Sequence, residues 1–346
     1  MINFSSENYD HVHPSIMQAL LEANQGFATS YGKDDDTSTA IEFLRREFGE
    51  KIEVHFTFNG TGANNFALGC LAQRHQSIFC SDIAHFYVDE STAPEAFIGC
   101  RLYSVNSEQG KINVDSLSQQ VKRIGDLHHP QPGVVTLTQP TEYGTVYSIA
   151  ELQAIKTFCS MHNLLLHVDG ARFFNAAVSL KVSLKELSTQ IGIDALTLGG
   201  TKIGMMFGEA VIFFGVSKPN HFWFMHKRSM QLASKNRFIA IQFAKLFENS
   251  LWMEIANYTN QLAKYFENQV KLIAGVQIVY PVQSNVVFLT LPKWLYLNLQ
   301  VYTSFYYWDE QKEYARLVFS FSNTKQEVIE FIELLVNRLE YSPLEG

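Results

Sequence analysis

The sequence predicts an α/β protein whose large domain holds a mostly parallel, seven-stranded sheet covered by helices. Two observations lead to this prediction. Through the first two thirds of the chain, short apolar runs alternate with amphipathic helical stretches, and repeated strand–helix–strand units of this kind build parallel sheets between two layers of helices. After about residue 250 the alternation stops, which indicates a smaller α+β domain. We therefore expect a large domain over 1–250, with an N-terminal arm, and a small C-terminal domain over 251–346.

The seven expected strands are the short apolar runs in the first two thirds of the chain. They span 54–60, 77–82, 101–106, 133–140, 164–169, 194–200 and 209–215. Helices are expected between them. One helix start is marked by a capping box, in which Ser148 is followed three residues later by Glu151.

The C-terminal domain has a different pattern. The sequence predicts a long helix from about residue 251, strands within 276–291 and 316–323, and a closing helix capped by Asn323. The aromatic-rich stretch 301–314 has neither a helical nor a strand period, so no element is predicted there.

Composition narrows the class of protein. The 346 residues include 27 Lys and Arg against 34 Asp and Glu, and this acidic balance argues against a nucleic-acid groove or a membrane-surface patch. No apolar stretch approaches the ~18 residues of a membrane-spanning helix, and the first ten residues lack the features of a secretory signal. The four cysteines have no C-x-x-C spacing, which predicts neither a zinc site nor disulfides. We expect a cytoplasmic, unprocessed protein without a bound metal.

The residues that follow the strands form the candidate site, because ligands of open α/β sheets bind at the carboxyl ends of the strands. After the first strand, Gly60, Thr61 and Gly62 open a helix, where backbone N–H groups and the helix dipole can hold a phosphate. The same residues are also typical of a plain tight turn. They do not complete a G-x-G-x-x-G pattern, which disfavours a dinucleotide site.

Three ionisable side chains follow other strands. His85 is expected in a loop after the second strand, either as a hydrogen-bonded structural residue or as a catalyst. Asp169 ends the leucine-rich run 164–169, where a buried carboxylate needs a cationic partner. Lys202 follows a buried strand within a glycine turn, where desolvation favours the neutral, nucleophilic amine; the alternative is a lysine at a surface turn.

Together these residues match the requirements of pyridoxal phosphate. This cofactor needs a lysine for its Schiff base, an acidic residue at its pyridine nitrogen, a ring over its face and a phosphate cup of backbone N–H groups. Lys202, Asp169, His85 and the turn at Gly60 provide these four parts. The cation that meets Asp169 would then be the pyridinium N–H. The sequence therefore predicts a pyridoxal-phosphate enzyme and disfavours a non-enzymatic binding protein or a nicotinamide dehydrogenase.

Two segments also resemble a known family. "HVDGARFFNA" (167–176) and "DALTLGGTKIGMMFGEAVIFF" (194–214) resemble the low-specificity L-threonine aldolases, which are pyridoxal-phosphate enzymes of the aspartate aminotransferase fold, fold type I. Further segments resemble the family in the same order: "FSSENYD" (4–10), "YGKDD" (31–35), "FNGTGANN" (58–65), "AHFYVDE" (84–90), "TQPTEYGTVY" (138–147) and "QLASKNRF" (231–238). The resemblance extends over most of the chain and is weaker in the C-terminal third.

The resemblance implies roles for individual residues. The catalytic residues would be Lys202, His85 and Asp169. The cofactor would be held by Gly60, Thr61, His85, Asp169, Arg172, Thr201, Lys202 and Arg237. The substrate would be bound by Ser6, Tyr31, Arg172 and Arg316. Tyr31 and Arg237 would reach the site from a neighbouring subunit, so the resemblance also implies a homo-oligomer, either a dimer or a homotetramer.

The activity that the resemblance implies is that of a carbon–carbon lyase. L-threonine and L-allo-threonine, which are β-hydroxy-α-amino acids, would be cleaved between Cα and Cβ to glycine and acetaldehyde. His85 would be the base, directly or through a water. The alternative is another fold type I enzyme that acts on a small amino acid, such as a β-eliminating lyase or a transaminase. Two positions depart from the family: Thr201 stands where many members have serine, and Glu142 where many have histidine.

Overall fold

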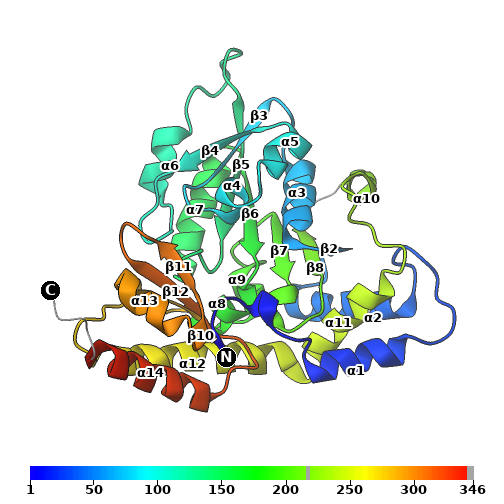
Figure 1. The fold of residues 1–346 in the computed structure, drawn as a ribbon. Coiled ribbons are helices and arrows are strands. Elements are labelled where there is room, and N and C mark those ends of the chain that lie inside the picture. The colour runs from blue at the N-terminus through cyan, green and yellow to red at the C-terminus, as the bar shows by residue number, and fades with distance from the viewer. Residues whose placement is uncertain (216–218, 341–346) are drawn as a thin grey trace.

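The computed structural model describes residues 1–215 and 219–340, and a seven-stranded sheet lies at its centre (Figure 1). The strands are β2 (Ile52–Thr57), β3 (Gln76–Ser81), β4 (Arg101–Val105), β5 (Gln131–Thr138), β6 (Leu165–Gly170), β7 (Ala195–Gly199) and β8 (Glu209–Phe214). Their order is β2-β8-β7-β6-β5-β3-β4, and every neighbouring pair is parallel except the two pairs that involve β8. The predicted mostly parallel sheet is confirmed, and each expected segment overlaps one strand.

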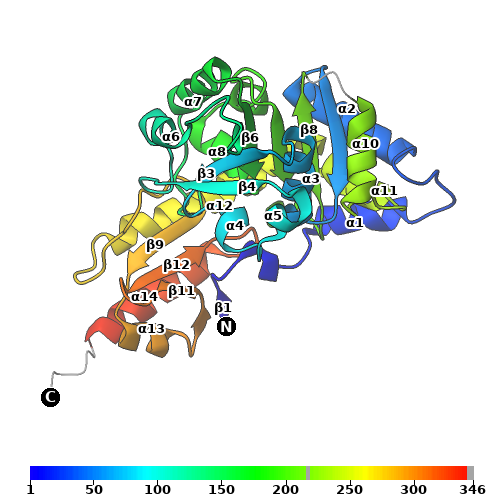
Figure 2. The same ribbon diagram turned by 90° about the horizontal axis from the view of Figure 1, so that it is seen from above.

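Helices cover both faces of this sheet, and Figure 2 shows α6 and α7 on one side of it and α4 and α5 on the other. The helices before residue 248 are α1 (Pro14–Ala23), α2 (Asp35–Phe48), α3 (Gly60–Leu71), α4 (His85–Val88), α5 (Ala93–Ile98), α6 (Val114–Gln120), α7 (Ile149–Met161), α8 (Phe173–Leu180), α9 (Leu184–Leu187), α10 (Pro219–Arg228) and α11 (Arg237–Phe247). Short 3₁₀ helices are η1 (Glu7–Tyr9), η2 (Thr201–Ile203) and η3 (Glu248–Ser250). Within residues 1–215 and 219–340, no helix has the length and apolarity needed to cross a membrane.

The central strands are apolar throughout because both of their faces are buried. Successive residues of a strand point to opposite faces. Val135 of β5 and Leu196 of β7 belong to the apolar core that includes α7, α8 and α11, whereas their neighbours Val134 and Ala195 belong to a second core with α3 and α5. Strands buried on both faces therefore read as continuous apolar runs, which is why the sequence located them.

The capping box that starts α7 is confirmed. Ser148 Oγ accepts a hydrogen bond from Glu151 N at 3.3 Å, and Glu151 Oε2 accepts one from Ser148 N at 2.7 Å. These two bonds satisfy backbone donors that a helix start otherwise leaves without partners.

The C-terminal part contains an antiparallel sheet of three strands, which are β11 (Tyr306–Asp309), β12 (Tyr314–Val318) and β9 (Val286–Thr290). Its helices are α12 (Leu251–Val270), the expected long helix, α13 (Lys293–Leu299) and α14 (Lys325–Glu340). Within 276–291 only β9 is a strand, and Ile278 makes a single bridge to Leu289. The stretch 301–314 forms β10 (Thr303–Ser304) and β11, where a register shift between Tyr307 and Asp309 interrupts the alternation that identifies a strand.

The prediction that Asn323 caps the last helix is wrong. Because α14 begins at Lys325, the capping residue is Thr324, which forms a capping box with Glu327. Thr324 Oγ1 accepts from Glu327 N at 3.2 Å, and Glu327 Oε2 accepts from Thr324 N at 2.7 Å. Asn323 instead donates from Nδ2 to Asn3 O at 3.0 Å, so it fastens the N-terminal arm.

The N-terminal arm packs on the C-terminal part of the chain. β1 (Ile2–Asn3) pairs in parallel with β10, and the buried Phe4 contacts Phe319 and Phe331. Figure 1 shows the N-terminus beside β10 and α14. The arm therefore brings the following residues, Ser6 and Glu7, to the place where the large sheet and the C-terminal sheet meet.

The expected boundary between residues 250 and 251 coincides with the start of α12. The first turns of this helix place Trp252 and Ile255 in the core of the large sheet, and its later turns place Leu262 and Phe266 in the core of the C-terminal sheet. The division into domains at this boundary stays a prediction.

We predict that His167 makes the fold sensitive to acid. The ring is buried in β6, with Nδ1 2.8 Å from Thr136 Oγ1 and Nε2 3.0 Å from Thr197 Oγ1, and burial lowers the pKa of His167 from 6.5 to about 4. The unfolded chain therefore binds this proton more readily. The contribution of His167 to stability is complete above pH 6.5 and is lost as the pH falls from 6.5 to 4, a loss of roughly 3 kcal/mol.

The measurement is the free energy of unfolding in urea at several pH values between 7.5 and 4.5. His167→Gln should lose less of its stability over this range than the wild type does. Equal losses in the two proteins would contradict the prediction.

Candidate active site

The carboxyl ends of the parallel strands open into a cavity of about 700 Å³. The structure brings most of the predicted site residues together around it: Ser6, Gly60, Thr61, His85, Asp169, Arg172, Thr201, Lys202 and Arg316. They come from the N-terminal arm, from the segments that follow β2, β3, β6 and β7, and from β12. Tyr31 and Arg237 do not line this cavity.

Asp169 lies at the end of β6 and is 4% exposed. Its Oδ2 accepts a hydrogen bond from Asn64 Nδ2 at 2.8 Å, and its Oδ1 accepts one from Ala171 N at 3.1 Å. Gly199 of β7 packs against this turn so closely that a Cβ would lie 2.4 Å from Ala171 O, so only glycine fits there. Within the described part of the chain, no lysine, arginine or histidine forms an ion pair with Asp169. A cationic partner therefore has to come from a ligand.

Lys202 lies in η2, directly after β7, and its amine faces the cavity without a hydrogen-bonding partner among residues 1–215 and 219–340. Glu209 holds this turn, because its Oε2 accepts from Gly200 N at 2.7 Å and its Oε1 accepts from Thr201 Oγ1 at 2.9 Å. Burial lowers the pKa of Lys202, and the nearby charge of Arg172 lowers it further. Both effects favour the neutral amine, which is the nucleophile.

The prediction that His85 lies in a loop is wrong, because His85 is the first residue of α4. Its Nδ1 lies 2.9 Å from Glu90 Oε1, and this hydrogen bond raises the pKa of His85 against the opposite effect of burial. Glu142 Oε1 accepts from His85 N at 2.8 Å and from Thr138 Oγ1 at 2.8 Å. Burial raises the pKa of Glu142 to about 7. Glu142 thus holds the backbone of His85, and Glu90 holds its ring.

The turn after β2 presents the N-terminus of α3 to the cavity. Asn59 caps this helix, with Oδ1 accepting from Gly62 N at 2.8 Å. A Cβ placed on Gly60 would meet no atom within 4 Å, so the space in front of this residue is open. Gln231 covers Gly62 from the other side, and its Oε1 accepts from Phe58 N at 3.0 Å. An open helix N-terminus of this kind fits a phosphate group.

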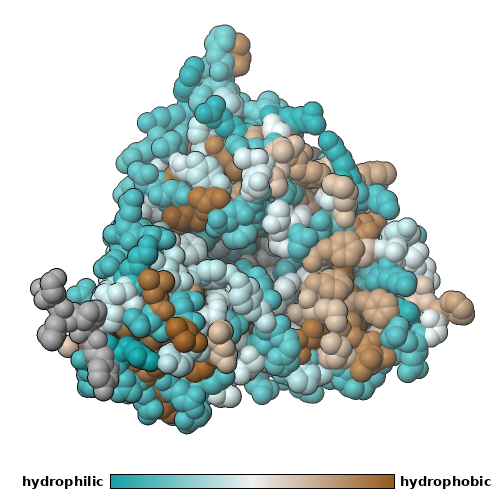
Figure 3. Space-filling view, viewed as in Figure 1, coloured by the Kyte–Doolittle hydropathy of each residue, from teal (hydrophilic) through white to brown (hydrophobic). Residues whose placement is uncertain are grey.

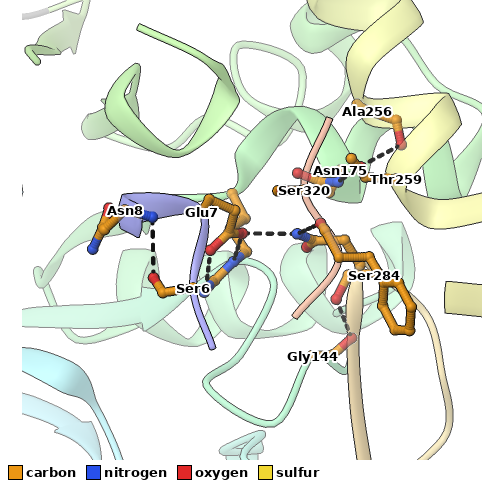
Figure 4. A network of polar contacts seen from close by, with 12 residues as sticks. Ser6, Glu7, Asn8, Gly144, Asn175, Ala256, Thr259, Ser284 and Ser320 are labelled. Carbon is orange, nitrogen blue, oxygen red and sulfur yellow. Dashed lines mark hydrogen bonds and ion pairs between the residues drawn. The ribbon is translucent and has the colours of Figure 1, made fainter. Parts of the chain in front are cut away.

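Arg172 is already paired with a carboxylate of the chain. Its Nε donates to Glu7 Oε1 at 2.6 Å and its Nη2 donates to Glu7 Oε2 at 2.9 Å, and Asn285 Nδ2 donates to Glu7 Oε1 at 2.7 Å. Burial alone would raise the pKa of Glu7. Arg172, Lys202 and Asn285 together outweigh burial and lower the pKa to about 2. Figure 4 shows Ser6 and Glu7 on the N-terminal arm at the centre of this polar network. Of the guanidinium nitrogens of Arg172, this pairing leaves Nη1 for a ligand.

Arg316 is held by aromatic rings instead of a carboxylate. Its Cζ lies 5.0 Å from the centroid of the Tyr306 ring and 4.7 Å from that of Trp308, and its Nη2 donates to Ser5 O at 3.4 Å. Its Nε is buried and has no hydrogen-bonding partner among the described residues. Burial lowers the pKa of Arg316 to about 10, so the side chain stays charged at neutral pH. A ligand carboxylate would supply the missing partner.

Tyr31 and Arg237 lie close together outside the cavity. Tyr31 N donates to Ser234 O at 2.9 Å, three residues before Arg237 at the start of α11. Arg237 Nη1 donates to Gln25 O at 3.3 Å, and Lys227 Nζ lies 4.9 Å from the centroid of the Tyr31 ring. The structure of one chain therefore does not unite these two residues with the other predicted site residues.

Sequence reasoning missed several side chains that line or support the cavity: Glu7, Asn64, Glu90, Glu209, Tyr306 and Trp308. Four of them lie inside segments that resemble the family, and the other two, Tyr306 and Trp308, lie within the stretch 301–314, for which no element is predicted. A local signal was present only for Glu90, which follows His85 by five residues in the same segment, where a glutamate near a histidine can indicate a pair.

Known proteins resemble this chain in sequence and in fold. The model of the beta-eliminating lyase family matches residues 3–291. Low specificity L-threonine aldolases of Pseudomonas aeruginosa and of a Pseudomonas species are 42% and 41% identical over 289 residues, which cover 83% of this chain and 84% of each relative. The chain belongs to the low-specificity L-threonine aldolases. The threonine aldolase of Leishmania major superposes with a TM-score of 0.93 at 26% identity and covers 98% of this chain and 99% of its own.

Pyridoxal phosphate, the cofactor of this aldolase family, fits the residues that line the cavity. Asp169 is buried without a cationic partner from the described chain, and the protonated pyridine nitrogen is such a cation. The free amine of Lys202 and the open turn at Gly60 match the aldehyde and the phosphate of the cofactor. The residues present therefore fit this group.

We predict that Glu7→Gln destabilises the aldolase, because it leaves the buried guanidinium of Arg172 without its counter-charge. The expected loss is roughly 3 kcal/mol in the free energy of unfolding near pH 7. Since folding lowers the pKa of Glu7 to about 2, the stabilisation is complete above pH 4.5 and is lost as the pH falls from 4.5 to 2.

Urea unfolding curves measure this effect, and Glu310→Gln is the matched control. Glu310 pairs with Lys293 at 2.9 Å on the surface, where both side chains are more than half exposed, so its removal should change stability little. The prediction fails if the two variants are equally stable.

Proposed function

We propose that this aldolase cleaves L-threonine and L-allo-threonine to glycine and acetaldehyde with pyridoxal phosphate as cofactor. The observation that carries the proposal is the set of charges in the cavity. The amine of Lys202 lines the same cavity as Asp169 and Arg316, two charged side chains that lack an ion-pair partner in the described chain. Asp169 suits the ring nitrogen of the cofactor, and Arg316 suits the carboxylate of an α-amino acid. The relatives are named L-threonine aldolases, and because threonine carries a β-hydroxyl group, we expect this group in the substrate.

In this proposal, bound pyridoxal phosphate supplies an electron sink for the electron pair left on Cα when the Cα–Cβ bond breaks. Lys202 would hold the cofactor through its aldehyde carbon, Asp169 would pair with its ring nitrogen and His85 would cover its ring. Gly60 and Thr61 hold its phosphate through the N-terminus of α3. Thr201 keeps the turn of Lys202 in place through Glu209.

The substrate-binding residues orient the bond that breaks. Arg316 binds the substrate carboxylate, supported by Ser6 and by Nη1 of Arg172. This places the β-hydroxyl group toward His85, which takes its proton as the Cα–Cβ bond opens.

The test is the incubation of purified protein and pyridoxal phosphate with each of the two diastereomers. Both should yield glycine and acetaldehyde in equal amounts. Lys202→Ala should lose the visible absorbance of the bound cofactor and, with it, turnover. 2-Oxobutyrate and ammonia in place of glycine and acetaldehyde would favour a β-eliminating lyase, and 3-hydroxy-2-oxobutyrate would favour a transaminase. A colourless wild type that still turns over would remove the cofactor from the mechanism.

We also propose that two copies of the chain share their active sites, in a dimer or a tetramer. Tyr31 and Arg237 support this, because they lie together outside the cavity of their own chain. Apolar side chains are exposed on the same side of the molecule, which carries α1, α10 and α11 (Figure 3). They include Leu21 at 60%, Phe224 at 76%, Met230 at 78% and a fully exposed Phe27. A second copy would cover these residues and receive Tyr31 and Arg237 in its own cavity.

Complementation between two inactive variants tests this sharing. In a mixture of Lys202→Ala and Arg237→Ala chains, a hybrid dimer has one site with both substitutions and one intact site. Random exchange should therefore restore about a quarter of the wild-type activity. The matched control mixes Lys202→Ala with Asp169→Ala, which line the cavity of the same chain, and should restore none. A single-chain mass in light scattering would contradict the proposal.

We propose a cytoplasmic location for the enzyme. The support is chemical: all four cysteines are unpaired, and three of them, Cys80, Cys100 and Cys159, are buried thiols.

A further inference from the structure

Behind His85 lies a buried carboxylate to which the roles proposed above assign nothing. Glu90 follows α4 and has a side chain that is 1% exposed, whereas the side chain of His85 is 49% exposed and lines the cavity. Glu90 Oε1 is 2.9 Å from Nδ1 of the ring. The carboxylate thus contacts the imidazole at Nδ1 from the buried wall of the cavity, which leaves Nε2 without a contact to Glu90.

The surroundings of Glu90 make it depend on this contact. Asn64 Nδ2 lies 2.8 Å from Asp169 Oδ2 but 3.4 Å from Glu90 Oε1, so its stronger hydrogen bond goes to Asp169. Glu90 Oε2 is enclosed and has no hydrogen-bonding partner among residues 1–215 and 219–340. A buried carboxylate is costly unless it accepts hydrogen bonds. The short hydrogen bond available to Glu90 comes from the ring Nδ1–H of His85.

The contact decides which ring nitrogen carries the proton. A neutral imidazole has one N–H donor and one acceptor nitrogen, and an ionised carboxylate can only accept. Hydrogen bonding to Glu90 therefore places the proton of neutral His85 on Nδ1. The other nitrogen, Nε2, then carries the lone pair, and it has no hydrogen-bonding partner within the described residues.

We propose that Glu90 and His85 form a dyad, in which Glu90 is a positioning residue that keeps the proton on Nδ1 and leaves Nε2 to take the proton of the substrate's β-hydroxyl group. The inference rests on the proposed function. The O–H bond breaks as its proton binds Nε2, and its electron pair becomes the second C–O bond of the aldehyde. The Cα–Cβ pair stays with Cα, and one proton returned to Cα completes glycine. While protonated, the imidazolium lies against the negative charge of Glu90.

Other charged groups also face His85. Lys202 of η2 lowers the pKa of the ring, Asp169 of β6 raises it, and Glu142 accepts the hydrogen bond of the His85 backbone N–H. The hydrogen bond to Glu90 is the largest of these influences, and the pKa of His85 is raised. If a neutral amide replaced the carboxylate of Glu90, Lys202 and burial would lower the pKa of His85.

The experiment compares wild type with Glu90→Gln as holoenzymes. kcat/KM for L-threonine should fall on the order of 10²-fold, because an amide can hold the ring but no longer selects the tautomer or stabilises the imidazolium. The fall should lie in kcat, since Arg316 and the carboxylate contacts are unchanged. The acidic limb of the pH profile of kcat/KM should move to lower pH, because the base form of His85 then persists to lower pH. The absorbance of the bound cofactor and its response to glycine should stay as in the wild type.

The chain contains a matched control for this substitution. Glu53 Oε1 lies 2.9 Å from Nε2 of the buried His55, which is the same type of pair in β2, and neither residue lines the cavity. Glu53→Gln should therefore leave both the rate and the pH profile of threonine cleavage unchanged. A change equal to that of Glu90→Gln would show a general effect of removing a carboxylate that pairs with a histidine and would overturn the dyad.

A double-substitution cycle keeps the inference falsifiable if Glu90→Gln folds poorly. Because Glu90 acts through the ring, Glu90→Gln should cause no further loss of kcat in a His85→Asn background. An equal additional loss, or a fall in rate with an unmoved acidic limb and loss of cofactor absorbance, would show a structural role and overturn the dyad. A wild type that cleaves neither diastereomer refutes the proposed function and the dyad's catalytic role with it, whereas an active wild type with an unchanged Glu90→Gln refutes the dyad alone.

Discussion

The ion pair between Glu7 and Arg172 joins three parts of the chain at one point. Glu7 belongs to the N-terminal arm, Arg172 follows β6 of the large sheet, and Asn285, which precedes β9 of the C-terminal sheet, donates to the same carboxylate. Neither charge can be buried alone without a large cost, so folding of the cavity requires the arm and both sheets to be in place together. This constraint also brings Ser6 to the cavity, because it directly precedes Glu7.

Sequence reasoning located the elements whose signal is local. The strands of the large sheet are buried on both faces and read as apolar runs, and Asp169 and Lys202 follow such strands directly. It missed what depends on distant parts of the chain. Glu7 lies 165 residues from Arg172, and no periodicity reports such a pair. The stretch 301–314 was uninformative for a different reason, because β11 is short and contains a register shift.

The buried carboxylates around the cavity show how the same group takes different states in different surroundings. Glu7 lies against a guanidinium and has a pKa of about 2. Glu142 and Glu209 accept hydrogen bonds from backbone N–H groups and hydroxyls but form no ion pair with any residue of 1–215 and 219–340, and burial raises the pKa of each to about 7. Both therefore serve to hold turns, one at His85 and the other at Lys202, without adding a full charge to the cavity near neutral pH.

The charges that remain define what the cavity can bind. Glu7 neutralises Arg172, so the positive side chain left without a carboxylate partner among the described residues is Arg316, which is held by aromatic rings. At the end of β6, Asp169 is a buried carboxylate that has no ion-pair partner among the described residues. A ligand that satisfies both must carry an anionic group and a cationic group. An α-amino acid and pyridoxal phosphate together would supply a carboxylate for Arg316, a protonated ring nitrogen for Asp169 and an aldehyde for the amine of Lys202.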